Sequence, residues 1–108
     1  MAVNFEIPTT SIKVGTGNFT VRGMNSEDIV FLSSVYLEDM KKVVAKYGEQ
    51  GRVQKNRVAD FVMELAKAFP MMTVEIISRC AEATDSESVD KFRRLSFVKQ
   101  VEALRAIT

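Results

Sequence analysis

The chain has 108 residues, and its content of 46% hydrophobic and 27% charged residues is typical of a single folded domain rather than a disordered segment. The formal net charge of +1 argues against a dedicated nucleic-acid-binding protein, which would carry a strong basic excess. With no histidine and one cysteine, the chain lacks the commonest general base and cannot assemble the usual zinc sites or an intramolecular disulfide.

No targeting or membrane-spanning segment is visible in the sequence. No apolar run approaches the ~18 residues that a membrane span needs. The first residues, MAVNFEIPTT, lack the basic segment and the following apolar segment of a secretory signal. The lone Cys80 fits a reducing compartment. We therefore expect a cytoplasmic protein without a membrane partner, a cofactor or a metal.

Residues 1–23 predict an extended arm followed by a β-hairpin. Pro8 cannot occupy an interior strand or helix position, so the first ten residues are expected to be extended. Two alternating runs, SIKV and FTVR, flank the residues GTGN, whose glycines supply the positive φ of a hairpin turn. These glycines lack the G-x-G-x-x-G spacing of a dinucleotide-binding loop, and no Lys-Ser/Thr pair follows them, which excludes a P-loop.

The apolar face of this hairpin carries Phe19 and Val21. An isolated hairpin is barely stable in water, so this face is expected to pack on a helix or to pair with another chain. We expect the two side chains to pack on the chain's own helices. Whether the strand edge seeks a second subunit stays open.

The first predicted helix begins at about Asn25 or Ser26, either of which can cap it, and runs to about Tyr47. The acidic residues Glu27 and Asp28 stand at the positive end of the helix dipole, and Gly48 is the expected stop. One apolar stripe, with spacings of three and four residues, follows the whole length: Ile29, Leu32, Tyr36, Met40, Val43 and Tyr47.

The remainder of the chain predicts further helices at about 55–69, 70–83 and 89–94, and a last one after Ser96. Pro70 ends one helix and opens the next, because proline lacks the N–H donor but fits the first helical turn. Ser96 caps the last helix, in which Phe97, Val101 and Leu104 are expected to be buried. The prediction is a mainly α fold in one domain over residues 1–108: a bundle of four to five helices over residues 25–108, preceded by a short N-terminal β-hairpin.

No residue pattern indicates catalysis. Cys80 lies on an apolar helical face without a histidine to activate it, so we expect an inert buried thiol. The basic clusters RVQKNR and KFRR are flanked by acidic residues and have little aromatic interleaving, which favours solvated faces over a nucleic-acid site. The residues alone therefore predict a small helical interaction module and no enzyme.

Methionines are the other candidates for contacts with a partner. Methionine fills irregular gaps in cores and also lines adaptable binding surfaces, and for any single methionine here the core interpretation is favoured. Neighbours on a helix lie about 100° apart, so Met71 and Met72 cannot both face one core, and one of them is a candidate for an inter-chain contact. The candidate partner-binding residues are Phe19, Val21, Met63, Met71 and Met72.

Three stretches, in order, resemble a known family: VGTGNFTVRGMNSEDIVFL, AKAFPMMTVEIISRCAEA and RRLSFVKQVEALRAIT. Together they are similar to the tail assembly chaperones of long-tailed bacteriophages, also called pre-tape-measure proteins. That family often shows a V-R-G-L-S-x-x-D-I helix start after a short β segment, then a P-x-L-V-x-x-I-I-x-x-A helix. The chain departs from the pattern at Met71, where an acidic residue is expected, and at Ser96, where proline is common.

The resemblance implies a non-catalytic chaperone that binds the long, helical tape measure protein and keeps it soluble until the tail tube polymerises around it. It further implies a homo-oligomer, a frameshifted longer form of the same protein as a partner, and a location in the cytoplasm of the infected bacterial host but not in the mature virion. No cofactor, nucleic acid or membrane is implied. The alternative is another small helical phage adaptor or regulatory protein, with or without an association with DNA.

Overall fold

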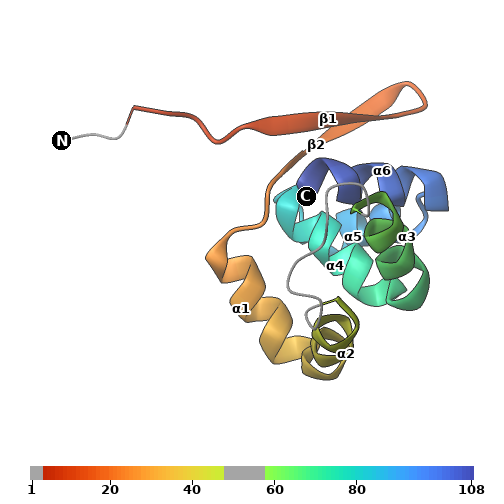
Figure 1. The fold of residues 1–108 in the computed structure, drawn as a ribbon. Helices are drawn as coiled ribbons and strands as arrows, with labels where there is room; N and C mark the ends of the chain where they lie inside the picture. The colour runs from red at the N-terminus through yellow and green to blue at the C-terminus, as the bar shows by residue number, and fades with distance from the viewer. Residues whose placement is uncertain (1–3, 48–57) are drawn as a thin grey trace.

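A computed structural model describes residues 4–47 and 58–108 and shows six helices and one antiparallel hairpin in them (Figure 1). The predicted mainly α fold with an N-terminal hairpin is confirmed. None of the helices in these two ranges is long and apolar enough to cross a membrane. In chain order the elements are β1 (Thr9–Val14), β2 (Gly17–Arg22), α1 (Ser26–Val35), α2 (Leu37–Tyr47), α3 (Val58–Ala68), α4 (Pro70–Cys80), α5 (Ser86–Arg93) and α6 (Phe97–Ile107).

The hairpin lies over α6, and the residues before β1 project away from the helices (Figure 1). Ile12 is paired with Phe19 across the two strands, which places both side chains on the face that meets the helices. Val21 is buried on this face, and the Phe19 ring meets the Phe92 ring edge-on at 5.1 Å between centroids. The expectation that the hairpin side chains pack on the chain's own helices is therefore confirmed.

The turn of the hairpin is shorter than the sequence predicted. Val14 pairs with Gly17, so only Gly15 and Thr16 form the turn, and Gly17 already belongs to β2. Gly15 has a φ of 60°, the left-handed conformation that a tight hairpin turn requires and that glycine adopts without steric cost.

The prediction of one continuous helix from about Asn25 to Tyr47 is wrong, because the helix breaks at Tyr36 into α1 and α2. Tyr36 has φ −117° and ψ 41°, outside the helical region. Before it, the Ser34 hydroxyl donates to the Phe31 carbonyl at 2.8 Å, a bond that competes with regular helix geometry. After it, the acidic residues Glu38 and Asp39 favour a new helix N-terminus. Residues 4–47 and 58–108 therefore contain six helices, where the sequence predicted four to five.

Helix α4 is the centre of the bundle and contacts α1, α3, α5, α6 and β2. It begins at Pro70 as predicted, and it ends at Cys80, slightly before the predicted Ala83. Its buried hydroxyls are satisfied by carbonyls: Thr73 donates to Leu65 and Ser78 donates to Val74. The predicted stop at Gly48 and the predicted helix start near residue 55 lie outside the described residues.

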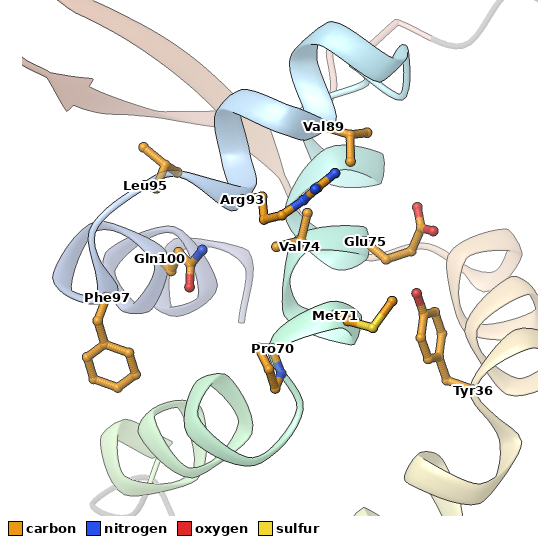
Figure 2. A pocket seen from close by; sticks show the side chains of 10 residues that line it. All are labelled: Tyr36, Pro70, Met71, Val74, Glu75, Val89, Arg93, Leu95, Phe97 and Gln100. Atoms are coloured by element: carbon orange, nitrogen blue, oxygen red, sulfur yellow. The ribbon is translucent and has the colours of Figure 1, made fainter.

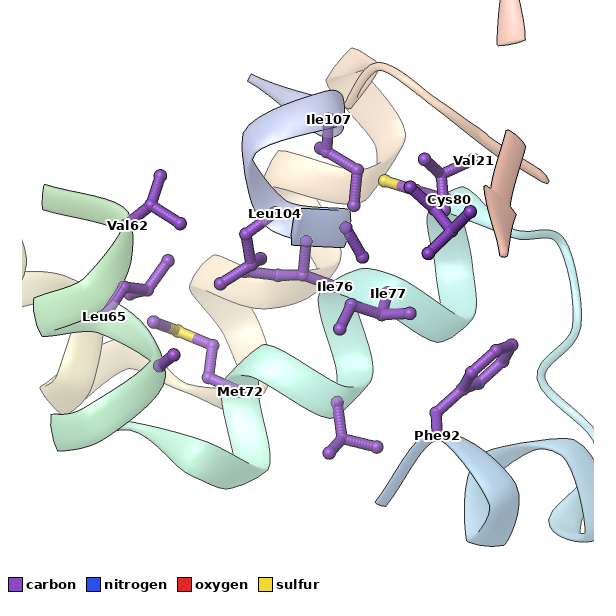
Figure 3. Packing of buried hydrophobic residues seen from close by; sticks show 14 of the residues in the cluster. Val21, Val62, Leu65, Met72, Ile76, Ile77, Cys80, Phe92, Leu104 and Ile107 are labelled. Carbon is purple, nitrogen blue, oxygen red and sulfur yellow. The ribbon is translucent and has the colours of Figure 1, made fainter. Parts of the chain in front are cut away.

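Helices α5 and α6 begin at side-chain caps. Asp85 accepts a hydrogen bond from the Ser88 amide at 3.0 Å, so α5 begins earlier than the predicted residue 89. Ser96 caps α6 as predicted and accepts from the Lys99 amide at 3.2 Å. The core faces of α4 and α6 meet in Figure 3, where Ile76 and Ile77 lie beside Leu104 and Ile107.

Phe97 was expected to be buried, and this expectation is wrong: its side chain is 41% exposed. The buried stripe of α6 consists of Gln100, Ala103, Leu104 and Ile107. Phe97 continues that stripe by one turn at the helix N-terminus, but there the stripe borders a groove instead of meeting a neighbouring helix.

Candidate functional site

An apolar groove of about 740 Å³ runs beside the N-terminal half of α4 (Figure 2). Its walls come from four parts of the chain that are far apart in sequence: the α1–α2 junction, α4, α5 and the start of α6. Figure 2 shows Met71 and Glu75 of α4 on the side of Tyr36, and Gln100 and Phe97 on the other side. The lining residues are Tyr36, Pro70, Met71, Val74, Glu75, Val89, Arg93, Leu95, Phe97 and Gln100.

The groove is apolar with a few polar groups among its lining residues. Met71 is 75% exposed, so its side chain is available for contact with a partner. Glu75 and Arg93 add one charge of each sign to the lining. The Tyr36 phenol is protonated at neutral pH, and burial raises its pKa further, so it can donate a hydrogen bond to a partner. Such a surface suits an apolar segment with a polar edge.

The structure separates the five candidate partner-binding residues. Met71 lies in the groove, whereas Met72 is buried in the core beside α3, which agrees with the expectation that the two methionines face different ways. Val21 is also a core residue, and Phe19 packs on Phe92. Met63 is 46% exposed on α3, away from the groove. Their roles in partner binding stay predictions.

Sequence reasoning missed a charged cluster that joins the hairpin to two helices. Asp28, in the first turn of α1, is only 1% exposed. Its carboxylate accepts from Arg22 of β2 at 2.7 Å and from Arg79 of α4 at 3.0 Å. It also accepts from the Asn25 amide at 3.0 Å, while the Asn25 side chain accepts from the Asp28 amide at 2.9 Å, which completes a capping box.

The two arginines are held from several sides. Arg22 also donates to the backbone carbonyl of Arg79 at 3.1 Å and to the Glu82 carboxylate at 3.2 Å. The Arg79 guanidinium lies over the Phe31 ring, 4.3 Å from its centroid. Among the described residues, no buried side-chain nitrogen or oxygen lacks a hydrogen-bond partner. The cluster thus connects β2, α1 and α4 through polar groups that all have hydrogen-bond partners.

A sequence signal for this joint existed in VRGMNSEDI, one of the motifs that carries the family resemblance. Arg22 is its arginine and Asp28 its aspartate. The spacing Asn25-x-x-Asp28 also matches a capping box. Arg79 could not be assigned, because it is 51 residues from Asp28 in the chain.

The hydrogen bonds from Arg22, followed by those from Asn25 and Arg79, hold the pKa of Asp28 at about 2, against the burial that would raise it. The ordinary value is 3.8, so the carboxylate stabilises the fold above about pH 4 and this stability is lost as the pH falls toward about 2. The pKa difference corresponds to about 2 kcal/mol.

We therefore expect the free energy of unfolding to fall by about 2 kcal/mol over this acid range. Urea unfolding at a series of pH values measures it. The variant Asp28→Asn should lose most of this acid dependence, while Asp85→Asn, at an exposed cap, should keep it. If the stability of Asp28→Asn depended on acid pH as wild type does, Asp28 would not be the source of this acid dependence.

Cys80 agrees with the expected inert, buried thiol. Cys80 is buried in the core, and burial raises the pKa of its thiol to about 11, so it stays protonated. Within residues 4–47 and 58–108, no group of three or more His, Cys, Asp or Glu side chains could hold a metal ion.

Comparison with known proteins identifies the family. Searches of curated proteins and of solved structures gave no significant match. A family model described as pre-tape measure protein matches residues 1–108. The match supports a role in phage tail assembly and confirms the resemblance seen in the sequence motifs. The chain belongs to the pre-tape measure protein family.

Proposed function

We propose that this chain is a non-catalytic chaperone that binds the tape measure protein and keeps it soluble until the tail tube polymerises around it. The observation that carries the proposal is the groove beside α4, which presents apolar side chains and two charges at a surface of a small tail-assembly protein. A holdase needs adaptable apolar contacts and no acid–base chemistry.

A helical client fits the chemistry of this groove. Helices bind in grooves through apolar residues spaced three or four positions apart, and the polar face of the helix stays in solvent. Met71 and Phe97 offer apolar contacts, and methionine adapts its shape to different side chains. Glu75 and Arg93 can bind opposite charges along the edge of the client helix.

The proposal extends to assembly and location. The chain associates with itself and with a frameshifted longer form, acts in the cytoplasm of the infected bacterial host, and is not retained in the mature virion. The support for these steps is the family membership.

The DNA-associated alternative has less support. In the KFRR segment, Lys91, Arg93 and Arg94 each lie within 4 Å of an acidic side chain of the same helix, as expected for a solvated face. The RVQKNR segment lies outside the described residues. Steeply salt-dependent binding to duplex DNA would favour this alternative over the chaperone.

Co-expression with the tape measure protein of the same genome tests the proposal. Wild type should increase the soluble fraction of that protein. Met71→Glu should abolish most of the increase and weaken binding of a purified helical fragment by about tenfold or more, because it places a charge where an apolar contact forms. Soluble fraction and dissociation constant are the two measurements.

Val30→Glu is the control, since it places the same charge at an exposed apolar position outside the groove. It should behave as wild type. Equal effects of the two substitutions would exclude the groove as the binding site. No gain in solubility with wild type would contradict the chaperone function itself.

A further inference from the structure

The N-terminal arm, residues 4–8, is extended and exposed although it carries two large apolar side chains. Phe5 is 70% exposed and Ile7 is 60% exposed. They alternate with Glu6, so in an extended segment both apolar side chains point the same way. Pro8 lacks an N–H donor and biases Ile7 toward an extended conformation. The arm is thus preorganised for contact with a partner.

A second groove, of about 860 Å³, lies under the tip of the hairpin. Its apolar part includes Val14 and Phe19 from the strands and Phe92 and Leu95 from the α5–α6 region. Three basic side chains line it, and no acidic one does. The basic residues are Lys91, Arg94 and Lys99.

These basic side chains can bind an additional carboxylate. Each pairs with an acidic side chain of its own helix, at 3.7 Å for Lys91, 2.9 Å for Arg94 and 3.2 Å for Lys99. Exposed pairs of this kind contribute little stability, so they do not prevent binding of another anion. Glu6 is the only charged residue between Asn4 and Ile12, and it therefore complements the basic edge of the groove.

The arm and the groove lie at opposite ends of the hairpin (Figure 1). The six residues of β1 span about 20 Å at ~3.3 Å per residue. Phe5 is four residues before Thr9, which gives a reach of about 14 Å at ~3.6 Å per residue. Folded back along β1, the arm could bring Phe5 level with Phe19 but not with the hairpin tip, and in the structure it instead projects away from the helices with Phe5 and Ile7 exposed (Figure 1).

From this geometry we infer that the arm of one copy docks in the hairpin-tip groove of a second copy. Phe5 and Ile7 contact the apolar part, and Glu6 binds the basic edge. The interface uses two different surfaces, so each docked copy still offers a free arm or a free groove, and the contact repeats head to tail. The inference deepens the self-association part of the proposed function and is independent of the groove beside α4.

Sedimentation velocity of the full chain over a concentration series tests the inference. Wild type should associate with increasing concentration. Phe5→Ser/Ile7→Ser should raise the dissociation constant by about a hundredfold, because both apolar contacts are lost. Val30→Ser/Val35→Ser is the matched control, since it makes the same kind of change at exposed positions of α1 outside both grooves. It should associate as wild type does.

A mixing experiment distinguishes the head-to-tail contact from a symmetric one. Val14→Glu/Lys91→Glu should disable the groove by repelling Glu6 while leaving the arm intact. Each double variant alone should be monomeric. Their equimolar mixture should form dimers and nothing larger, because one intact arm and one intact groove remain. Thermal unfolding of each variant verifies that the fold is retained.

The outcomes separate the two proposals. A wild-type chain that stays monomeric at high concentration would overturn both the inference and the self-association that it deepens. Association of Phe5→Ser/Ile7→Ser equal to wild type, or a mixture without dimers, would overturn the arm-and-groove contact alone. Neither result would alter the test with the tape measure protein, which uses Met71.

Discussion

Replacing Asp28 with alanine should lower the free energy of unfolding by about 3 kcal/mol or more. The substitution leaves Arg22 and Arg79 without the carboxylate that both bind, and removal of one partner from a buried ion pair leaves uncompensated charge. A domain of this size has a total stability of about 5–15 kcal/mol, so the loss is large. Urea unfolding followed by far-UV circular dichroism measures it.

Two further variants sharpen this test. Asp85→Ala removes an exposed helix cap and should cost clearly less than Asp28→Ala. Asp28→Asn keeps the size and one acceptor oxygen but removes the charge, so its cost should lie between the other two. An Asp28→Ala variant no less stable than Asp85→Ala would show that the cluster does not join β2, α1 and α4 as its geometry indicates.

The substitution Ile77→Ala should cost about 2–5 kcal/mol, through lost burial and the cavity that remains. Ile77 is fully buried on α4, in the region where α4, α6 and the hairpin meet (Figure 3). Since α4 contacts most other elements, the neighbouring side chains cannot collapse into the space without moving several helices. Urea unfolding followed by far-UV circular dichroism measures this loss of stability.

Val98→Ala is the control for this substitution. Val98 is exposed in the first turn of α6, and truncation there should change stability by less than about 0.5 kcal/mol. Similar losses for the two variants would mean that Ile77 is not held in a closely packed core. A loss for Ile77→Ala well above that for Val98→Ala is the expected result.

Local patterns predicted most of the elements. Alternation of apolar and polar residues indicated the hairpin, Pro70 marked the boundary of α4, and Ser96 marked the start of α6. Each of these signals acts within a few residues, through turn geometry, a missing N–H or a side-chain cap. Such interactions form in the same way whatever the remainder of the chain does.

The incorrect predictions came from the periodicity of apolar residues. The apolar stripe through Tyr36 is compatible with one long helix, and periodicity alone does not show that the helix breaks there. Phe97 continues the buried stripe of α6, but burial requires a neighbouring element, and a groove borders the helix at that turn. Periodicity indicates which face of a helix is apolar and not how much of that face is covered.

The candidate site was only partly predictable for the same reason. The sequence identified Met71 or Met72 as a contact residue, because neighbouring helical residues point in different directions. Choosing Met71 required the position of α3, against which Met72 is buried.

The sequence by itself determined the hairpin, the helix caps, the lack of histidine-based chemistry and the family motifs, because these depend on residue type and short spacing. Only the tertiary structure decided which apolar residues remain exposed, which distant cation meets Asp28, and where the two grooves lie. The physical reason is that burial, buried ion pairs and grooves are properties of several segments packed together. Residues as far apart as Tyr36 and Gln100 share one surface only after the helices have assembled.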